Sequence, residues 1–200
     1  MNDIIILDNV IPVEKQQDLI ELCENPYFTW SYNSGNVQPE YSNDEFPVTS
    51  LSLNHQQMYN VIYKDQETVS PFIHFFIPLL SAVPFTCGHL LKIKVNLTTC
   101  NPKYSNDCYG MPHADFPMIR NNITCIYYVN DSDGDTVIFN ERYGHTGDLT
   151  IKNKITPKQG RLVAFDGSLL HSGNFPRDNE NRIIVNINFL PYGGMKSWDH

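Results

Sequence analysis

Residues 91–98 read Leu-Lys-Ile-Lys-Val-Asn-Leu-Thr, and an apolar side chain occupies every odd position of this stretch. Such alternation is typical of a β-strand that buries one face. Further β-type runs follow it, at residues 123–129, 136–139, 161–165 and 182–189. Turn-rich segments separate the runs, at residues 131–134, 158–160 and 178–181. Several short, evenly punctuated strands predict a sandwich or barrel from residue 89 onward.

The first third of the chain has a different pattern. Residues 3–7 predict a short strand, and residues 30–50, rich in Asn, Ser, Pro and Tyr, predict a loop. One helix is expected from Pro12 to Glu24, with Ile11, Leu19, Leu22 and Cys23 buried. A second is expected from Ser70-Pro71, with Phe72, Phe75, Phe76, Leu79 and Leu80 facing a core. We expect one domain over residues 1–200: helical support in 1–88 outside a mainly β core in 89–191.

Composition excludes several classes of protein. The chain has 200 residues, 14 basic and 22 acidic, and a formal net charge of −8, which argues against a surface built for nucleic acid. The five cysteines form no CxxC pair and predict reduced thiols. The apolar N-terminal run is too short for a signal peptide, and prolines interrupt the uncharged stretch 68–91. We therefore expect a cytoplasmic protein without a membrane span.

One short motif has the character of a metal site. His113-Ala114-Asp115 places an imidazole and a carboxylate two residues apart, so both can point to one side of an extended segment. His171, at the end of the run 161–170, supplies a distant third ligand. Two histidines and one carboxylate leave open positions on the ion, as in non-haem Fe(II) oxygenases.

Arg182 begins the last β-run, and it shares a strand face with Ile184, Asn186 and Asn188. This polar face predicts a pocket wall, and a guanidinium there is suited to bind a carboxylate bidentately. Arg177, in the preceding loop, is the rival anchor for the same carboxylate.

Together these residues resemble the Fe(II)- and 2-oxoglutarate-dependent oxygenases. Residues 123–130, 133–139 and 157–167 are similar to prolyl 4-hydroxylase-type members, and the resemblance is greatest to small oxygenases encoded by bacteriophages. It covers most of the chain and is densest over residues 89–191. The spacing of eleven residues between His171 and Arg182 is one longer than expected, and the turn at 178–181 can absorb it.

The resemblance implies a double-stranded β-helix, which is a jelly-roll or cupin-like core. It implies Fe(II) held by His113, Asp115 and His171, with 2-oxoglutarate and O₂ as cosubstrates. The distal carboxylate of 2-oxoglutarate would pair with Arg182 and also contact Tyr128, the second tyrosine of its strand.

The function expected from this resemblance is a dioxygenase that hydroxylates a C–H bond and releases succinate and CO₂. Related halogenases have a small residue at the position of Asp115, so a carboxylate there favours hydroxylation. The substrate is expected to be peptidyl-proline or a free small molecule. The alternatives are a non-catalytic metal-binding β-sandwich module and a nucleic-acid demethylase on the same fold.

Some roles stay open at this point. Tyr104 and Tyr109 either border the cosubstrate or are ordinary loop aromatics. Asn96 lies on the polar face of its strand, and whether it lines the pocket is left open. Asp131, Asp133 and Asp135 lack the continuation of an EF-hand and predict a hairpin turn. A lid is expected within residues 30–50 or 103–112.

Overall fold

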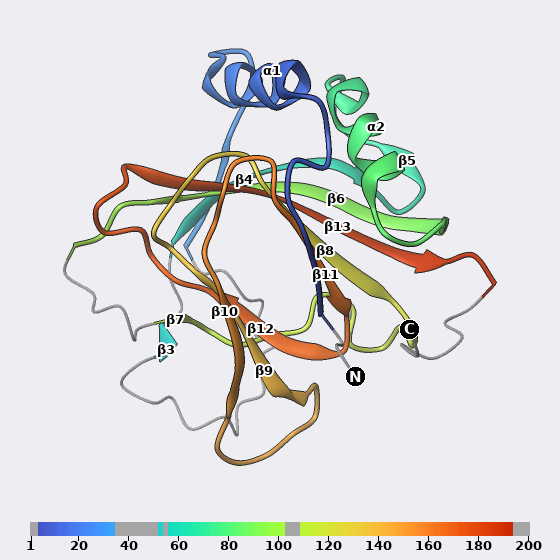
Figure 1. Ribbon diagram of the computed structural model, residues 1–200, viewed down its shortest axis with the longest axis vertical. Coiled ribbons are helices and arrows are strands. Elements are labelled where there is room, and N and C mark those ends of the chain that lie inside the picture. Colours follow the sequence, from blue (N-terminus) through green and yellow to red (C-terminus); the bar gives the residue numbers. More distant parts are fainter. Residues whose placement is uncertain (1–3, 35–51, 54–55, 103–108, 194–200) are drawn as a thin grey trace.

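The computed structural model describes residues 4–34, 52–53, 56–102 and 109–193, in which two antiparallel β-sheets face each other (Figure 1). The large sheet has the strand order β1 (Ile4–Leu7), β11 (Leu162–Asp166), β8 (Ile123–Tyr128), β13 (Asn181–Pro191), β6 (Cys87–Thr99), β4 (Gln57–Lys64) and β2 (Ser31–Asn33). Strand β5 (Glu67–Thr68) pairs with β4. The small sheet has the order β10 (Ile151–Ile155), β9 (Thr136–Arg142) and β12 (Leu169–Gly173). Two short parallel strands, β3 (Ser52–Leu53) and β7 (Tyr109–Gly110), pair beside them.

The chain passes repeatedly between the two sheets. It runs from β8 in the large sheet to β9 and β10 in the small sheet, then to β11, β12 and β13 in alternation. This winding confirms the expected double-stranded β-helix.

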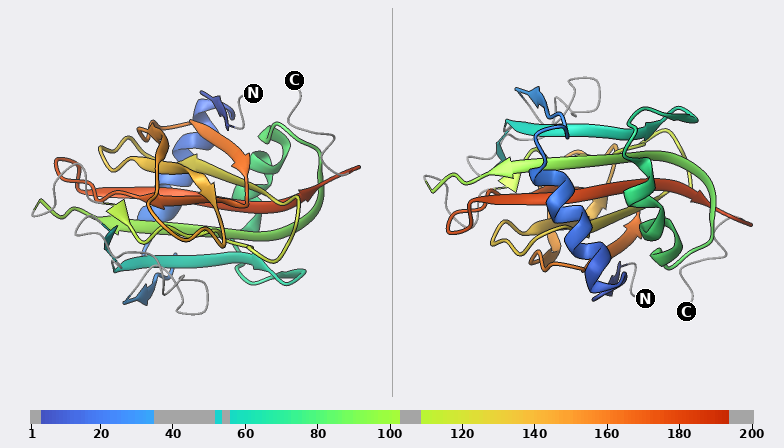
Figure 2. Two further views of the ribbon diagram at one scale, coloured as in Figure 1. Left: turned by 90° about the horizontal axis from the view of Figure 1, so that it is seen from below. Right: turned by 90° about the horizontal axis from the view of Figure 1, so that it is seen from above.

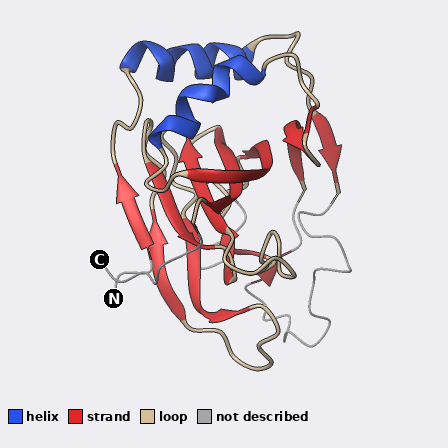
Figure 3. Ribbon diagram, turned by 90° about the vertical axis from the view of Figure 1, so that its right-hand side faces the viewer, coloured by secondary structure: helices blue, strands red, loops and turns tan. Residues whose placement is uncertain are grey.

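Both helices cover the outer face of the large sheet. α1 (Val13–Glu24) and α2 (Ile73–Ala82) lie across its strands, on the side away from the small sheet (Figures 2 and 3). Pro12 directly precedes the first residue of α1 and makes no side-chain capping hydrogen bond. Both predicted helices are confirmed, with Leu19 and Leu22 of α1 and Phe76 of α2 buried, but α2 begins at Ile73 rather than at Ser70-Pro71. Neither helix has the length and apolar character needed to cross a membrane.

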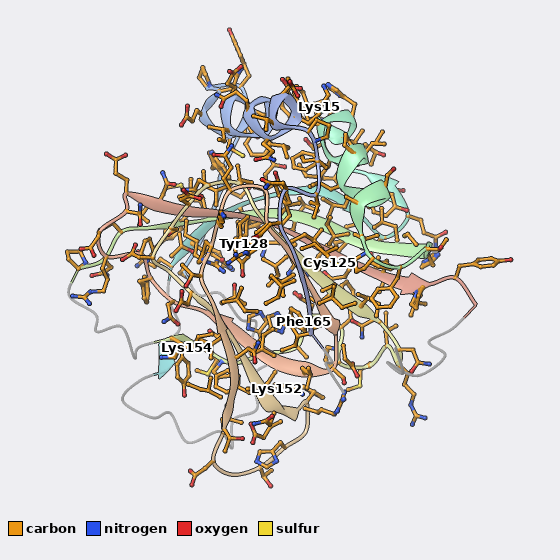
Figure 4. All side chains as sticks on the ribbon, in the orientation of Figure 1. Lys15, Cys125, Tyr128, Lys152, Lys154 and Phe165 are labelled. Atoms are coloured by element: carbon orange, nitrogen blue, oxygen red, sulfur yellow. The ribbon has the colours of Figure 1, made fainter. Side chains whose placement is uncertain are left out.

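The alternation of β6 separates two environments. Its odd side chains Ile93 and Val95 are fully buried in the cluster that the sheet forms with the helices. A second cluster lies between the sheets and includes Tyr128, Phe165 and Ile184; Figure 4 labels the first two of these in that space. The even, polar side chains of β6 therefore face the same interior as the small sheet.

Some sequence predictions of local structure were wrong. Residues 31–33, predicted as loop, form edge strand β2, and β4 and β10 were not predicted. The run 161–170 is not continuous, because it divides at Gly167 into β11 and β12 of different sheets. A Cβ atom at Gly167 would lie 1.8 Å from Oδ1 of Asn122, so the close approach at this turn requires glycine.

Candidate active site

A cleft of about 340 Å³ opens between the two sheets. Strands β4, β6 and β13 form one wall, and β9, β12 and residues 113–115 form the other. This size is within the usual range for small-molecule sites, roughly 300–1,000 Å³. His113, Asp115 and His171 lie at one end, and Arg182 lies in the same cleft.

Backbone pairing brings the two predicted histidines together. The N–H of His113 donates to the carbonyl of His171 at 3.0 Å, and the reverse bond is 2.9 Å long. The imidazole centroids are 4.8 Å apart as a result. Oδ2 of Asp115 lies 3.6 Å from Nε2 of His171. Three residues separated by up to 58 positions are thus gathered at one place (171 − 113 = 58).

The ring nitrogens of these histidines have distinct partners. Nδ1 of His113 lies 2.9 Å from the carbonyl of Met111, and Nδ1 of His171 lies 3.2 Å from the carbonyl of Leu169. A carbonyl can only accept, so each Nδ1 carries a proton, and in the neutral ring Nε2 is then the nitrogen with a free lone pair. Nε2 of His171 is buried and has no hydrogen-bond partner.

Asp115 is held as a carboxylate by several donors. Nζ of Lys92 lies 2.8 Å from its Oδ1, while the side-chain amides of Asn186 and Asn188 donate to its Oδ2 at 2.8 and 3.2 Å. Burial raises the pKa of Asp115, but Lys92 and the two histidines outweigh this and hold the pKa well below its usual range.

His113 is neutral at physiological pH. Burial, reinforced by His171, lowers its pKa to about 4, although Asp115 opposes the shift. A neutral His113 and an ionised Asp115 are in the protonation states that metal ligation requires.

The donor atoms of His113, Asp115 and His171 are chemically suited to a divalent transition-metal ion. Nitrogen and carboxylate oxygen are suitable ligands for Fe(II), and the unpartnered Nε2 of His171 is a buried acceptor lacking a cation or donor. Among the described residues, however, no three His, Cys, Asp or Glu side chains already have the closed spacing of a metal cage. Asp115 is engaged with Lys92 instead.

Arg182 is almost wholly buried, with 5% of its surface exposed. Its Nη2 donates to Oγ1 of Thr136 at 2.7 Å, and its Nε has no partner. No carboxylate lies within ion-pair distance of it in the described part of the chain. Its Nη1 would lie 3.2 Å from a Cβ at Gly173, so the glycine leaves room around the guanidinium. A buried, unpaired guanidinium is costly, and an anionic ligand would offset that cost.

The other predicted residues fall around these two centres. Tyr128 is fully buried behind the wall, and its hydroxyl donates to Oγ1 of Thr136 at 2.7 Å rather than facing the cleft. Asn96 lines the cleft. Tyr109 packs against Phe139, outside the cleft, and Tyr104 lies outside the described residues. Most of the two segments expected to contain a lid also lies outside them.

The two loop alternatives have structural roles. The carboxylate of Asp133 accepts backbone N–H groups from Arg177, Asp178 and Asn179, which ties the predicted turn to the loop before β13. The predicted hairpin turn was wrong, because the segment between Tyr128 and Thr136 crosses from β8 in the large sheet to β9 in the small sheet. Arg177 is not among the residues that line the cleft.

Several residues that line the cleft were missed by the sequence reasoning, among them Thr136, Lys92 and Lys94. The signal for the lysines was the polar, even-numbered face of residues 91–98, which continues to Asn96 and Thr98. Thr136 had no distinguishing signal, because a threonine at the start of a strand is common.

Comparison with known proteins agrees with this geometry. Residues 102–190 match the family model of the 2OG-Fe(II) oxygenase superfamily. The matched segment contains His113, Asp115, Tyr128, His171 and Arg182. Residues 102–190 are therefore similar to that superfamily, whose members use Fe(II), 2-oxoglutarate and O₂. No curated protein matches the sequence.

Solved structures share the fold at low sequence identity. A Trichoplax adhaerens prolyl hydroxylase in complex with a hypoxia inducible factor peptide fragment has a TM-score of 0.62 and 15% identity, covering 96% of this chain and 84% of that one. A Pseudomonas putida prolyl-4-hydroxylase has a TM-score of 0.53 and 12% identity, covering 94% and 92%. The non-heme alpha ketoglutarate dependent epimerase SnoN from nogalamycin biosynthesis has a TM-score of 0.60 and 11% identity, covering 94% and 78%. These relatives share a fold while differing in reaction.

Proposed function

We propose that this chain is an Fe(II)- and 2-oxoglutarate-dependent dioxygenase that hydroxylates a C–H bond. The observation that carries the proposal is a single cleft with a two-histidine, one-carboxylate cluster and a buried guanidinium that lacks a carboxylate partner. A structural metal module would need the cluster but has no use for the guanidinium. Metal and a dicarboxylate cosubstrate together account for both.

His113, Asp115 and His171 are the proposed ligands of the iron. The Nδ1 hydrogen bonds of both histidines fix the rings so that Nε2 is the coordinating atom. Asn186 and Asn188 orient the carboxylate of Asp115 from the large sheet. When bound there with 2-oxoglutarate, Fe(II) supplies the O₂-dependent oxidation of a C–H bond, with release of succinate and CO₂.

Arg182 is the proposed anchor for the distal carboxylate of 2-oxoglutarate. Oγ1 of Thr136 already accepts hydrogen bonds from Tyr128 and Arg182, so its own proton remains to be donated. We propose that Thr136 donates it to the same carboxylate. Tyr128 would then not contact the carboxylate itself, but would hold the Thr136 hydroxyl in position through its hydrogen bond.

Hydroxylation is the proposed reaction because Asp115 occupies the position that is a small residue in related halogenases. Ile126 and Ile184 give the cleft apolar walls that help to exclude water. The structural relatives that are prolyl hydroxylases suggest a peptidyl-proline substrate, and a free small molecule is the other class proposed.

Succinate formation tests this function. The purified chain, supplied with Fe(II), 2-oxoglutarate and O₂, is expected to release succinate slowly even without its substrate. The His171→Ala variant should abolish this release, whereas His74→Ala, at an exposed position of α2, should retain it. If metal and 2-oxoglutarate bind but no succinate forms, the chain is a binding module rather than an enzyme.

A further inference from the structure

The cleft is basic although the whole chain is acidic. Its charged lining residues are four cations, namely Lys64, Lys92, Lys94 and Arg182, and Asp115 is the only carboxylate among the described residues that line it. The chain as a whole has a formal charge of −8. A cleft with the opposite sign to the rest of the molecule attracts anions.

Three of these four cations already have an assignment. Lys92 pairs with Asp115 at 2.8 Å, and Arg182 is the proposed anchor of 2-oxoglutarate. Lys64 lies at the exposed rim, 3.4 Å from the carboxylate of Asp65. Lys94 is the remaining cation.

Lys94 has no carboxylate within ion-pair distance in the described part of the chain. Its ammonium instead lies over the ring of Tyr59, 4.7 Å from the centroid. Burial, together with the nearby charge of Lys92, lowers the pKa of Lys94 to about 8, so the group is still mostly charged at pH 7. A partly buried ammonium without a counter-ion favours an anionic ligand.

Asn96 provides an independent sign of a ligand at the same place. It is 8% exposed, it lines the cleft, and its Oδ1 is buried without a hydrogen-bond partner. It is two residues from Lys94 on the same face of β6, and its register partner on β4 is Tyr59. Lys94, Asn96 and Tyr59 therefore form one patch, here called the β4–β6 subsite.

The β4–β6 subsite lies beside the proposed iron ligands. Lys94 is the register partner of Asn186, whose side-chain amide donates to Asp115. Arg182 is the partner of Thr98, four residues further along β6. A molecule in the subsite would thus be next to Asp115 and would leave Arg182 to the cosubstrate.

We infer that the β4–β6 subsite binds the carboxylate of the primary substrate through Lys94. Asn96 Oδ1 accepts a hydrogen bond from an N–H or O–H of the same molecule. This rests on the proposed function and narrows its substrate to a free, carboxylate-bearing small molecule, such as an amino acid, rather than an internal residue of a peptide. A single ammonium matches a monoanion better than a phosphate dianion.

Binding to the Mn(II)- and 2-oxoglutarate-loaded chain without O₂ tests the inference. The probes are the proteinogenic L-amino acids, their carboxamides, and glycerol 3-phosphate as a phosphate without a carboxylate. We expect at least one amino acid to bind, and its carboxamide to bind at least tenfold more weakly. Lys94→Gln should lower the affinity for the amino acid by at least tenfold, and Lys94→Arg should recover part of that affinity. The matched control is Lys15→Gln, on α1 at the opposite side of the large sheet (Figure 4).

A second measurement separates the subsite from the cosubstrate site. Titration of 2-oxoglutarate into Mn(II)-loaded Lys94→Gln should match the wild type. Loss of 2-oxoglutarate binding in this variant would overturn the inference, as would equal binding of acids and amides, binding of the phosphate alone, or no binding by any acid.

Failure of the subsite and failure of the proposed function give different experimental results. Carboxylate binding that depends on Lys94 but never stimulates succinate formation would overturn the proposed function and leave the subsite intact. Succinate formation stimulated equally by acids and amides would overturn the subsite alone.

Discussion

At the scale of single residues, the buried charge of Arg182 predicts an anionic ligand. Its guanidinium is buried beside Thr136 with no carboxylate partner in the described residues. A hydrogen bond to a charged group contributes about 1.5–3 kcal/mol. Arg182→Ala should therefore weaken 2-oxoglutarate binding by roughly tenfold to a hundredfold, since about 1.4 kcal/mol is tenfold. Calorimetric titration of the Mn(II)-loaded variants measures this.

Arg177→Ala is the control for that titration, and it should bind 2-oxoglutarate as the wild type does. Arg182→Lys should recover part of the affinity, because the charge survives while the planar fork does not. If Arg177→Ala loses binding and Arg182→Ala does not, the anchor has been assigned to the wrong arginine.

Thr136 gives a second prediction at this scale. Thr136→Val keeps the shape of the side chain but leaves the Tyr128 hydroxyl and one Arg182 donor without their acceptor. We expect 2-oxoglutarate affinity to fall about tenfold or more, whereas Thr136→Ser, which keeps the hydroxyl, should remain near the wild type. Unchanged affinity in Thr136→Val would exclude Thr136 from the carboxylate site.

Residue types and spacing were enough to predict some of the side chains that line the cleft. His113, Asp115 and Arg182 belong to a motif whose order along the chain is informative, and the structure gathers them with His171 in one cleft. Lys94 could not be predicted in the same way. A lysine on a half-buried strand is usually solvated, and only the three-dimensional pairing of β4 with β6 shows that this one lies over Tyr59.

At the scale of elements, β13 is the strand on which the site and the core both depend. One face carries Arg182 and Asn186 into the cleft, while Ile187 on the other face is fully buried beneath the helices. Ile187→Ala should lower the free energy of unfolding by about 2–5 kcal/mol, because it leaves a cavity in a close-packed cluster. Denaturant titration measures the change.

Ile151→Ala is the matched control, because Ile151 lies on edge strand β10 and is 45% exposed. Its cost should stay within roughly 0.5 kcal/mol. Equal losses in both variants would contradict the assignment of β13 to the centre of the core.

Elements with a clear period were predicted, and those without one were not. β6 and β13 alternate strongly or run apolar, because each buries at least one complete face. β10 reads Ile-Lys-Asn-Lys-Ile and is mostly exposed, so it has little apolar pattern to detect. β12 lies in the other sheet from β11, and the turn between them packs Gly167 against Asn122.

At the scale of the whole molecule, the free energy of unfolding should depend on pH. The reason is that folding places His113, in its neutral form, in a partly buried site between the two sheets. Burial lowers the pKa of His113 to about 4, against about 6.5 when unfolded. Between these values the unfolded chain binds more protons than the folded one. The metal-free chain should therefore lose free energy of unfolding as pH falls from about 6.5 to 4.

His113→Gln removes this titration, so its stability should change less over the same pH window. Thermal unfolding at fixed pH steps compares the two proteins. A parallel pH dependence in both would show that His113 does not titrate between the folded and unfolded states in the way its burial requires.

The arrangement of strands and covering helices was predicted from the sequence. The contribution of the first third of the chain to the large sheet and to the cleft was not. Strands β2 and β4 extend the large sheet, and β4 supplies Tyr59 to the cleft. The chain therefore does not divide cleanly between support in 1–88 and site in 89–191, since the first segment also lines the cleft. The likeness to bacteriophage oxygenases and the cytoplasmic location stay predictions.

Metal and cosubstrate stoichiometry tests the central claim most directly. Under anaerobic conditions, calorimetry should show one Mn(II) bound per chain, and one 2-oxoglutarate bound once the metal is present. Asp115→Ala and His171→Ala should lose most of the metal binding, and His74→Ala should keep it. Full metal binding by both Asp115→Ala and His171→Ala would contradict the account, because the ion would then lie elsewhere.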